Sequence, residues 1–446
     1  MKISVVGTGY VGLVSGVCLA EVGHEVVCVD VDATKVAKIN DGVPPIYERG
    51  LEVMLQRNLE AQRMRATTDL RAAVLESELS LIAVGTPFDG SAIDLKYIRE
   101  VARQIGAILR EKDGYHVVVV KSTVVPGTTE TVVLPILEAA SGKRAGADFG
   151  VGMNPEFLRE GEAIDDFMHP DRIVLGGIDE RSIDALDQMY AVFSSVDKLR
   201  TSPKTAEMIK YTANSLLATL ISFSNEIGNL CAAVGNVDVV EVMQGVHLDK
   251  RLSPILASGD RVVPVVTTYL EAGCGFGGSC FPKDVKALIA FGRDAGQPMQ
   301  LLDAVVELNQ RQPQQVLDLL RRHYPELKGV RVAVLGLAFK PDTDDVRESP
   351  ALPVVWNLLE HEAEVVTYDP IASHEAKKVF RDAPVTYCAS MAEAVQGAQA
   401  VLIMTRWAEF KDLPKLLASL EHPPLVVDGR RMLDKHSVAH YEGIGL

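Results

Sequence analysis

The stretch Lys2-Ile-Ser-Val-Val-Gly7-Thr-Gly9-Tyr-Val-Gly12 decides how the chain begins to fold. It has the apolar run of a buried β-strand, followed by the pattern G-x-G-x-x-G and a helical segment. The first glycine of this pattern permits a tight turn, the second lets the backbone approach a pyrophosphate, and the third lets the helix pack on the strand. The free N–H groups at the start of the helix can bind phosphate oxygens. The stretch therefore predicts a dinucleotide-binding turn rather than a glycine-rich turn that binds nothing.

The next apolar run supports this interpretation and indicates which dinucleotide is bound. Glu25–Val29 has the composition of a second buried strand, and Asp30 follows it directly. A carboxylate at this point accepts hydrogen bonds from a ribose 2′-hydroxyl and repels a 2′-phosphate. We therefore expect the cofactor to be NAD rather than NADP.

Composition excludes several other classes of protein. The 446 residues are 47% hydrophobic and 24% charged, which is typical of a globular protein and not of a disordered, collagen-like or coiled-coil chain. With 45 basic and 60 acidic residues the net charge is −15, which argues against binding to nucleic acid or to an anionic membrane surface. Six cysteines without a C-x-x-C pair predict neither a disulfide scaffold nor a zinc site, so we expect no metal and a cytoplasmic location. Glycines interrupt the apolar stretch 3–22, and no basic segment precedes it, so a signal peptide or membrane span is not expected.

The chain alternates strand-like and helical segments in two separate parts. The predicted strands are Lys2–Val6, Glu25–Val29, Leu79–Ala83, His116–Lys121, Phe149–Met153 and Ile173–Gly176, and then Val332–Leu335, Glu364–Tyr368, Ala400–Met404 and Leu425–Val427. Between them we expect a long helix from Thr205 to about Asn236, a second over Val237–Gln244, and a third over Asp284–Gln310. Runs so rich in Val and Ile indicate parallel sheets covered by helices. The predicted fold is α/β, with two Rossmann-like doubly wound domains, 1–200 and 313–446, joined by a helical domain, 201–312.

Polar residues follow several of these strands, at the edge where open α/β sheets bind ligands. Thr86 lies in the turn after one strand and Thr123 after the next. Either could equally be part of an ordinary turn. Glu156 and Glu160 follow a third strand, and a helical turn would put both on one face.

The long helix and a glycine-rich segment carry further candidates. Glu207, Lys210 and Asn214 recur at helical spacing, although such a stripe alone is typical of a solvated face. In Glu271-Ala-Gly-Cys-Gly-Phe-Gly-Gly-Ser-Cys-Phe-Pro-Lys-Asp284, the glycines let a large ligand approach a thiol. A helix begins just after Cys280 and Lys283 is near, and both features favour a thiolate nucleophile. Cys274 lacks these neighbours, so it is the weaker candidate, and a packing role is expected for the other cysteines.

Taken in order, these motifs resemble those of the UDP-glucose/GDP-mannose dehydrogenase family over nearly the whole chain. The matching stretches are Gly7–Gly12, Pro45-Ile-Tyr-Glu48, Ser122-Thr-Val, Asn154-Pro-Glu-Phe-Leu, Gly277–Asp284, Gly336-Leu-Ala-Phe-Lys340, Asp345-Val-Arg-Glu-Ser349 and Asp428-Gly-Arg-Arg431. The resemblance implies a four-electron oxidation, in which the C6 alcohol of a nucleotide-linked hexose becomes a carboxylate and two NAD+ are reduced. UDP-glucose is the expected substrate, with GDP-mannose or a UDP-N-acetylhexosamine as alternatives.

The resemblance also implies a role for each site residue. Cys280 would attack an aldehyde intermediate and later carry a thioester, Lys210 and Asn214 would stabilise oxyanions, Asp284 and Thr123 would hold the attacking water, and Glu156 would be the acid/base residue. The residues expected to bind the cofactor are Gly7, Gly9, Tyr10, Val11, Gly12, Asp30, Lys35, Thr86, Thr123, Glu160, Lys283 and Arg347. Those expected to bind the sugar nucleotide are Glu156, Phe157, Leu158, Glu160, Lys210, Asn214, Arg251, Tyr269, Gly277, Lys340 and Arg430. A homodimer or higher homo-oligomer built on the long helix is implied as well, with Arg251 reaching the neighbouring subunit's site.

The sequence departs from the family pattern at two places. The stretch between Arg251 and Tyr269 is longer than the family's usual spacing, and Arg49 replaces a common proline. Two other classes of protein would fit part of this pattern. A two-electron β-hydroxyacid dehydrogenase needs neither the cysteine nor the second α/β part, and a non-catalytic NAD-sensing protein would not need the Cys/Lys/Asp set.

Overall fold

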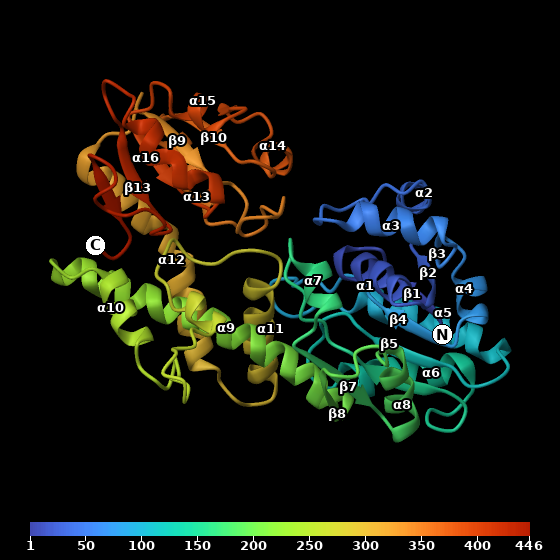
Figure 1. The fold of residues 1–446 in the computed structure, drawn as a ribbon. Coiled ribbons are helices and arrows are strands. Elements are labelled where there is room, and N and C mark those ends of the chain that lie inside the picture. The colour runs from blue at the N-terminus through green and yellow to red at the C-terminus, as the bar shows by residue number, and fades with distance from the viewer. The chain divides into compact units, whose positions relative to one another are not determined.

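The computed structural model describes residues 1–446, and the chain divides into two compact units, residues 1–213 and 214–446. The boundary falls within the longest helix, α9 (Pro203–Val234). Each unit contains one sheet (Figure 1). The three-domain division stays a prediction.

The first unit is built on an eight-stranded sheet with the order β3-β2-β1-β4-β5-β6-β7-β8. Its strands are β1 (Lys2–Val6), β2 (Glu25–Val29), β3 (Met64–Thr67), β4 (Leu79–Ile82), β5 (Val117–Val120), β6 (Gly150–Met153), β7 (Arg172–Gly177) and β8 (Asp197–Thr201). Its helices are α1 (Tyr10–Glu21), α2 (Ala33–Asn40), α3 (Leu51–Glu60), α4 (Leu70–Glu76), α5 (Lys96–Glu111), η1 (Thr129–Val133), α6 (Leu134–Ser141), α7 (Ala163–Met168) and α8 (Glu180–Met189).

Helices cover both faces of this sheet, as the apolar strands predict. Along β5, Val117 and Val119 pack with α1, α3 and α8, whereas Val118 and Val120 pack with α5 and α6. This alternation follows from the two-residue period of a strand. All neighbouring pairs are parallel except β6 and β7, which are antiparallel. The expectation of a wholly parallel sheet is wrong for this one pair, because the connection through the short helix α7 returns the chain in the opposite direction.

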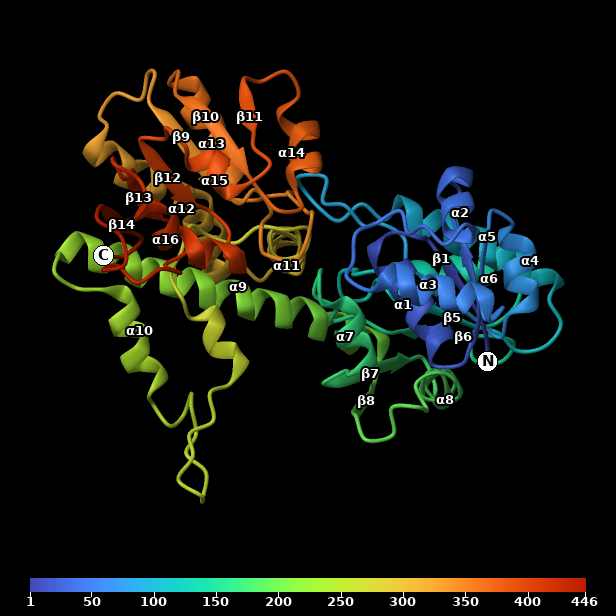
Figure 2. The same cartoon turned by 45° about the horizontal axis from the view of Figure 1, so that its top comes forward.

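The second unit repeats the same strand order in a six-stranded sheet, β11-β10-β9-β12-β13-β14 (Figure 2). The strands are β9 (Arg331–Leu335), β10 (Glu364–Tyr368), β11 (Val385–Tyr387), β12 (Ala400–Ile403), β13 (Leu425–Asp428) and β14 (Tyr441–Gly443). The helices are α10 (Val239–His247), η2 (Val265–Tyr269), α11 (Phe281–Asp294), α12 (Gln300–His323), α13 (Ala351–Glu360), α14 (Ser373–Phe380), α15 (Met391–Val395), η3 (Ala408–Asp412) and α16 (Leu413–Leu417). The single helix expected over 284–310 is in fact two, α11 and α12, because the chain turns at Gly296, whose φ is +75°.

Candidate active site

The glycine turn after β1 has the geometry that its sequence predicts. Gly7 adopts a φ of +100°, and a Cβ on Gly12 would lie 1.9 Å from the carbonyl oxygen of Gly7. A Cβ on Gly9 would have no atom within 4 Å. Gly9 is also the N-cap of α1 and offers no side-chain acceptor to the first turn of the helix. The backbone over Gly9 is therefore open to an anionic ligand, and this cradle fits a pyrophosphate.

Asp30 lies beside this turn at the end of β2. Its Oδ2 accepts from the Thr8 amide at 2.9 Å and from the Thr8 hydroxyl at 2.6 Å, and its Oδ1 accepts from the Asp32 amide at 3.0 Å. Burial opposes ionisation, but these donors and the nearby Lys35 outweigh it and hold the pKa of Asp30 below its usual value. The side chain is thus a fixed anion, which favours a ribose hydroxyl over a phosphate.

The turns after β4 and β5 meet at the same edge of the sheet. The Thr86 hydroxyl donates to the carbonyl oxygen of Thr123 at 2.8 Å, and the Ser122 hydroxyl donates to that of Val84 at 2.7 Å. Thr86 and Thr123 are therefore brought together, as residues that line one ligand site must be.

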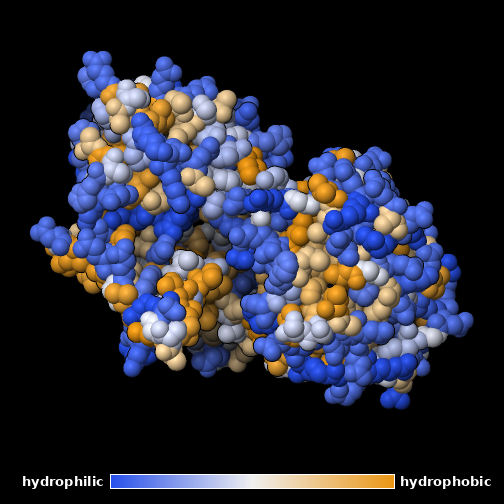
Figure 3. Space-filling view, in the orientation of Figure 1, coloured by the Kyte–Doolittle hydropathy of each residue, from blue (hydrophilic) through white to orange (hydrophobic).

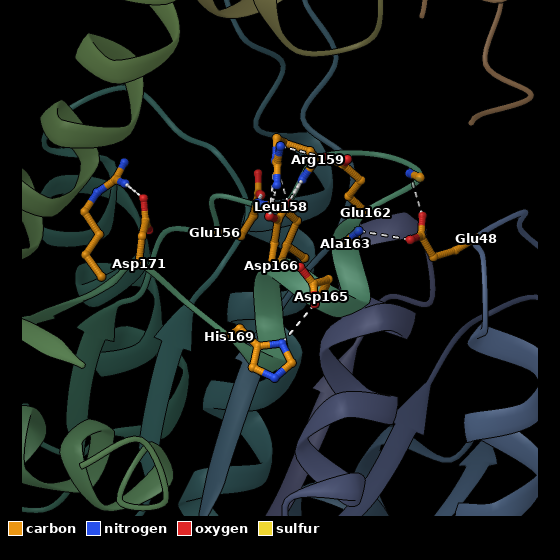
Figure 4. Close-up of polar contacts among 12 residues, drawn as sticks. Glu48, Glu156, Leu158, Arg159, Glu162, Ala163, Asp165, Asp166, His169 and Asp171 are labelled. Carbon is orange, nitrogen blue, oxygen red and sulfur yellow. Dashed lines mark hydrogen bonds and ion pairs between the residues drawn. The ribbon is translucent and has the colours of Figure 1, made fainter. Parts of the chain in front are cut away.

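Glu156 and Glu160 lie in an irregular loop, not in the helical turn that we expected. The structure has no helix until Ala163, and Glu156 accepts instead from the Leu158 amide at 2.6 Å. This side-chain contact satisfies the Leu158 N–H within the loop, without a backbone carbonyl from a helical turn. Figure 4 shows this loop running from Glu156 to α7.

A buried ion pair joins Glu156 to the long helix. The Lys210 ammonium lies 2.9 Å from Glu156 Oε1, and both side chains are about 95% buried (4% and 5% exposed). Burial raises the pKa of Glu156, but the charge and hydrogen bond of Lys210 outweigh it and hold that pKa below its usual range. Lys210 and Glu207 are buried rather than solvated, so the stripe on α9 is not a solvent-exposed face.

Two more buried charged residues lie in this unit: Lys121, which was not among the candidates, and Glu207 of the stripe on α9. Lys121 donates to Asn154 Oδ1 at 2.8 Å, and burial lowers the pKa of its ammonium group to about 8. Glu207 accepts from the amides of Gly127 (2.5 Å) and Thr129 (2.8 Å), and burial raises its pKa to about 7. Lys121 could have been noticed in the sequence, because it is a charged residue directly after an entirely apolar strand. Such a strand is buried, so the lysine at its end is expected to be buried as well.

In the second unit, the cysteine segment packs against the turn after β9. A Cβ on Gly277 would lie 2.2 Å from the carbonyl oxygen of Glu348, and one on Gly278 would lie 2.7 Å from the Phe339 ring. These glycines let the cysteine segment pack closely on the segment that contains Phe339 and Glu348. They would also let a ligand approach the backbone.

The two cysteines of this segment have different surroundings. Cys274 is fully buried, its Sγ lies 3.8 Å from the carbonyl oxygen of Met404, and burial raises the pKa of its thiol. Cys280 is the N-cap of α11 and is only partly buried, while the other five cysteines are buried. The thiol of Cys280 is therefore more accessible than that of Cys274, and the ranking of the two as nucleophiles stays a prediction.

Asp284 follows Cys280 on the first turn of α11 and is held by two partners. Asn214 donates to its Oδ2 at 2.6 Å, and the Lys283 ammonium donates to its Oδ1 at 2.6 Å. Asp284 is 1% exposed. The structure therefore joins the buried Asn214 and Asp284 and the partly buried Lys283 into one polar group.

The turn of the second sheet repeats the geometry of the first, with one important difference. Gly336 has a φ of +94°, and Asp369 follows β10 as Asp30 follows β2. However, Asp369 accepts from the amides of Leu337, Ala338, Ile371 and Ala372 and from the Trp407 indole. With all these donors already in place, Asp369 offers little to a ribose, which argues against a second NAD here.

The remaining candidates in this unit are placed as follows. Arg430 donates to the carbonyl oxygens of Met404 (2.7 Å) and Gly275 (2.8 Å), and Arg347 pairs with Asp345 at 2.8 Å.

The side chain of Arg251 is 86% exposed and pairs with Asp249. The longer stretch after Arg251 forms a small hairpin with a bridge between Ile255 and Arg261, which projects beyond α10 in Figure 2. Tyr269 lies in η2, 6.4 Å from Phe281 between ring centroids.

Comparison with known proteins gives one consistent family. Models of the UDP-glucose/GDP-mannose dehydrogenase family match the chain in three parts: the NAD binding domain at residues 1–194, the central domain at 204–311 and the UDP binding domain at 333–435. A UDP-glucose 6-dehydrogenase of Haloferax volcanii is 42% identical over the whole of both chains. A GDP-mannose 6-dehydrogenase of Pseudomonas putida is 40% identical over 93% of each chain. The solved structure of a UDP-glucose dehydrogenase from Pyrobaculum islandicum has a TM-score of 0.89 at 41% identity and covers 99% of this chain, with 97% of its own chain covered.

Proposed function

Because the chain belongs to the UDP-glucose/GDP-mannose dehydrogenase family and carries its NAD-binding domain, we propose that this oxidoreductase converts the C6 alcohol of a UDP-linked hexose to a carboxylate. The preferred substrate is UDP-glucose, which the names of several relatives support. The observation that supports a four-electron oxidation is the position of Cys280. It is the one partly exposed cysteine of six and lies at the start of α11.

We propose that NAD+ binds over the open backbone at Gly9. When bound, NAD+ accepts a hydride in each of two oxidation steps. Asp30 would bind the adenosine ribose through its fixed carboxylate, and the first turn of α1 would bind the pyrophosphate. The other proposed contacts are Gly7, Tyr10, Val11, Gly12, Lys35, Thr86, Thr123, Glu160, Lys283 and Arg347.

The first oxidation needs a base and a cation near the C6 oxygen. Glu156 is held as a carboxylate by Lys210 and can accept the hydroxyl proton. The Lys210 ammonium can stabilise the oxyanion that develops as the C–H bond breaks. The product of this step is an aldehyde at C6.

The second oxidation proceeds on Cys280. Its sulfur adds to the aldehyde carbon, the carbonyl oxygen gains a proton, and a thiohemiacetal forms. Removal of a hydride from this carbon and of the hydroxyl proton gives a thioester. Asp284 and Thr123 would orient a water that attacks the thioester, with Asn214 beside Asp284. Hydrolysis releases the sugar acid and restores the thiol. The sum is one alcohol, two NAD+ and one water giving one carboxylate, two NADH and three protons.

The nucleotide half of the substrate would bind in the second unit, through Lys340 and Arg430. The sugar contacts that we propose are Glu156, Phe157, Leu158, Glu160, Lys210, Asn214, Arg251, Tyr269 and Gly277. GDP-mannose and UDP-N-acetylhexosamines are the alternative substrates, since relatives that carry such names match the chain.

Counting the NADH released tests this proposal. We expect two NADH for each sugar acid formed, with UDP-glucose turned over faster than GDP-mannose or UDP-N-acetylhexosamines. Because Asp30 repels a 2′-phosphate, replacing NAD+ by NADP+ should lower kcat/KM at least tenfold. One NADH per sugar product would show a two-electron enzyme, and equal use of both cofactors would contradict the role of Asp30.

We also propose that the protein is a homodimer whose subunits pair through α9. Leu216, Phe223 and Leu230 are 55%, 49% and 57% exposed and recur every seven residues, and Leu220, Ile227 and Val234 extend the same stripe. A heptad stripe of apolar residues is typical of a helix that packs on a second helix. By length and composition alone α9 could also cross a membrane. However, its opposite side carries buried polar residues with protein partners, such as Asn214 and Asn225, and these favour a protein interface. We also propose a cytoplasmic location, since the six cysteines do not have the pattern of a disulfide scaffold.

Analytical ultracentrifugation tests the dimer. The intact chain should sediment as a dimer, and a Leu216→Asp/Phe223→Asp double variant should sediment as a monomer, because two buried carboxylates without partners would disfavour the interface. Exposed Glu226→Gln on the same helix is the control and should leave the dimer intact. A wild-type monomer at micromolar concentration would contradict the proposal.

A further inference from the structure

Glu48 is a buried carboxylate that the proposed reaction does not use. It lies between α2 and α3, is 6% exposed, and belongs to the Pro45-Ile-Tyr-Glu48 stretch. A buried carboxylate is costly unless it is well hydrogen-bonded, so its partners show what the residue does.

The partners of Glu48 come from two separate segments. The Gly161 amide donates to Oε2 at 2.7 Å, and the Ala163 amide donates to Oε1 at 2.9 Å, so the carboxylate binds the end of the acid-bearing loop and the start of α7. Figure 4 shows Glu48 beside the start of α7, with its carboxylate turned toward Ala163. The third donor is the Tyr10 hydroxyl, which belongs to the first residue of α1 in the glycine turn. The Tyr10 oxygen also lies 3.1 Å from the Gly161 nitrogen.

These contacts connect the loop of Glu156 and Glu160 to the NAD-binding turn. At its other end the loop is held by Asn154, which binds Lys121, and in its middle by the Glu156–Lys210 pair. Near Glu160 the loop has its own internal contacts, in which Arg159 pairs with Asp166 at 2.6 Å and with Glu162 at 2.6 Å. Glu48 and Tyr10 tie this part of the loop to α1. Gly161, with a φ of +87°, lets the chain turn toward them.

We propose that Glu48 is a positioning residue: it holds the loop that carries Glu156 and Glu160 at a fixed distance from the glycine turn, so that sugar and cofactor are presented to each other in one geometry. This inference rests on the proposed function, in which the glycine turn holds the cofactor and the loop holds the sugar. A carboxylate suits the task because it accepts from two amides and one hydroxyl at once, which a neutral amide cannot do.

Glu48→Gln tests the proposal. In this variant the amide NH2 faces one of the two backbone N–H groups, so one hydrogen bond is lost and the loop shifts. We expect kcat to fall by about ten- to a hundredfold, the range that displacements of around 1 Å cause in active sites. The dissociation constant of NAD+ measured by fluorescence should change less than about threefold, because Glu48 is buried and is not one of the proposed cofactor contacts. Glu162→Gln, an exposed carboxylate of the same loop, is the control and should keep wild-type kcat.

A second measurement does not depend on activity. Hydrogen exchange of the Gly161 and Ala163 amides should be faster in Glu48→Gln than in wild type and unchanged in Glu162→Gln. Tyr10→Phe keeps the ring, removes one donor, and should lower kcat by less than Glu48→Gln does. An inactive wild-type protein would contradict the proposed function and leave the exchange result as the test of Glu48. A folded Glu48→Gln with wild-type kcat and wild-type exchange would overturn the positioning role.

Discussion

Cys280→Ser should abolish steady-state formation of the sugar acid, with a fall in kcat of at least about a thousandfold. A serine hydroxyl is a far weaker nucleophile than a thiolate, and the oxygen ester that it can form hydrolyses more slowly than a thioester. We expect a short burst of no more than two NADH per active site, followed by near arrest. Mass spectrometry of the intact protein should then detect a trapped or very slowly hydrolysed acyl adduct, and peptide mapping should place it on residue 280.

Cys274→Ser is the matched control for this experiment. It lies six residues earlier in the same segment, but its sulfur is fully buried beside the carbonyl oxygen of Met404. The variant should keep its activity and lose about 1 to 3 kcal/mol of stability, because a hydroxyl is buried in place of a thiol. Iodoacetamide provides a second check, since Cys280 is the one cysteine of six that is not buried and should be alkylated first, with loss of turnover. Equal loss of activity in both serine variants, or full turnover after alkylation of Cys280, would contradict the nucleophile assignment.

Sequence patterns were sufficient to predict those elements whose structure depends mainly on neighbouring residues. The central strands, such as β1 and β5, are short runs of Val and Ile, and these could be predicted nearly to the residue. The strands at the edges, β3, β8, β11 and β14, were missed because they are short and partly exposed and so carry no clear apolar period. The break between α11 and α12 was missed because both helices have an apolar face and one glycine is a weak signal within such a pattern.

The candidate site divides in the same way. The glycine turn, Asp30 and the contrast between Cys274 and Cys280 depend on sequence neighbours and could be predicted. The contacts of Glu48 with Gly161, of Glu207 with Thr129 and of Asn214 with Asp284 join residues that are far apart in the chain. Their residue types are common on protein surfaces, and only the tertiary fold shows that each carboxylate is buried and which donors it binds.

Gly12→Ala should disrupt the cofactor turn itself, and this is the second large effect that we expect. A Cβ at residue 12 would lie 1.9 Å from the carbonyl oxygen of Gly7 and 3.2 Å from the Cβ of Ala83. Both neighbours are held in place, because Gly7 is fixed by its positive φ and its bond to Val29, and Ala83 by the end of β4. Since backbone cannot move aside as a flexible side chain can, α1 has to shift away from the sheet. We expect a loss of about 3 kcal/mol or more, which lowers Tm by roughly 6 to 12 °C in a unit of this size, together with loss of NAD+ binding.

Gly9→Ala separates the effect on the fold from the effect on the cofactor. Its Cβ would enter open space, and the φ of Gly9, −69°, suits any residue. This variant should therefore keep a Tm within about 2 °C of wild type, because no protein atom is displaced. NAD+ affinity should nevertheless fall at least tenfold, since the added methyl group occupies the place where the pyrophosphate approaches the backbone. Thermal unfolding and NAD+ titration of the two variants side by side measure this contrast. If Gly9→Ala bound NAD+ as wild type does, the pyrophosphate would have to lie elsewhere, and if Gly12→Ala kept the wild-type Tm, the close approach of α1 to Gly7 would be wrong.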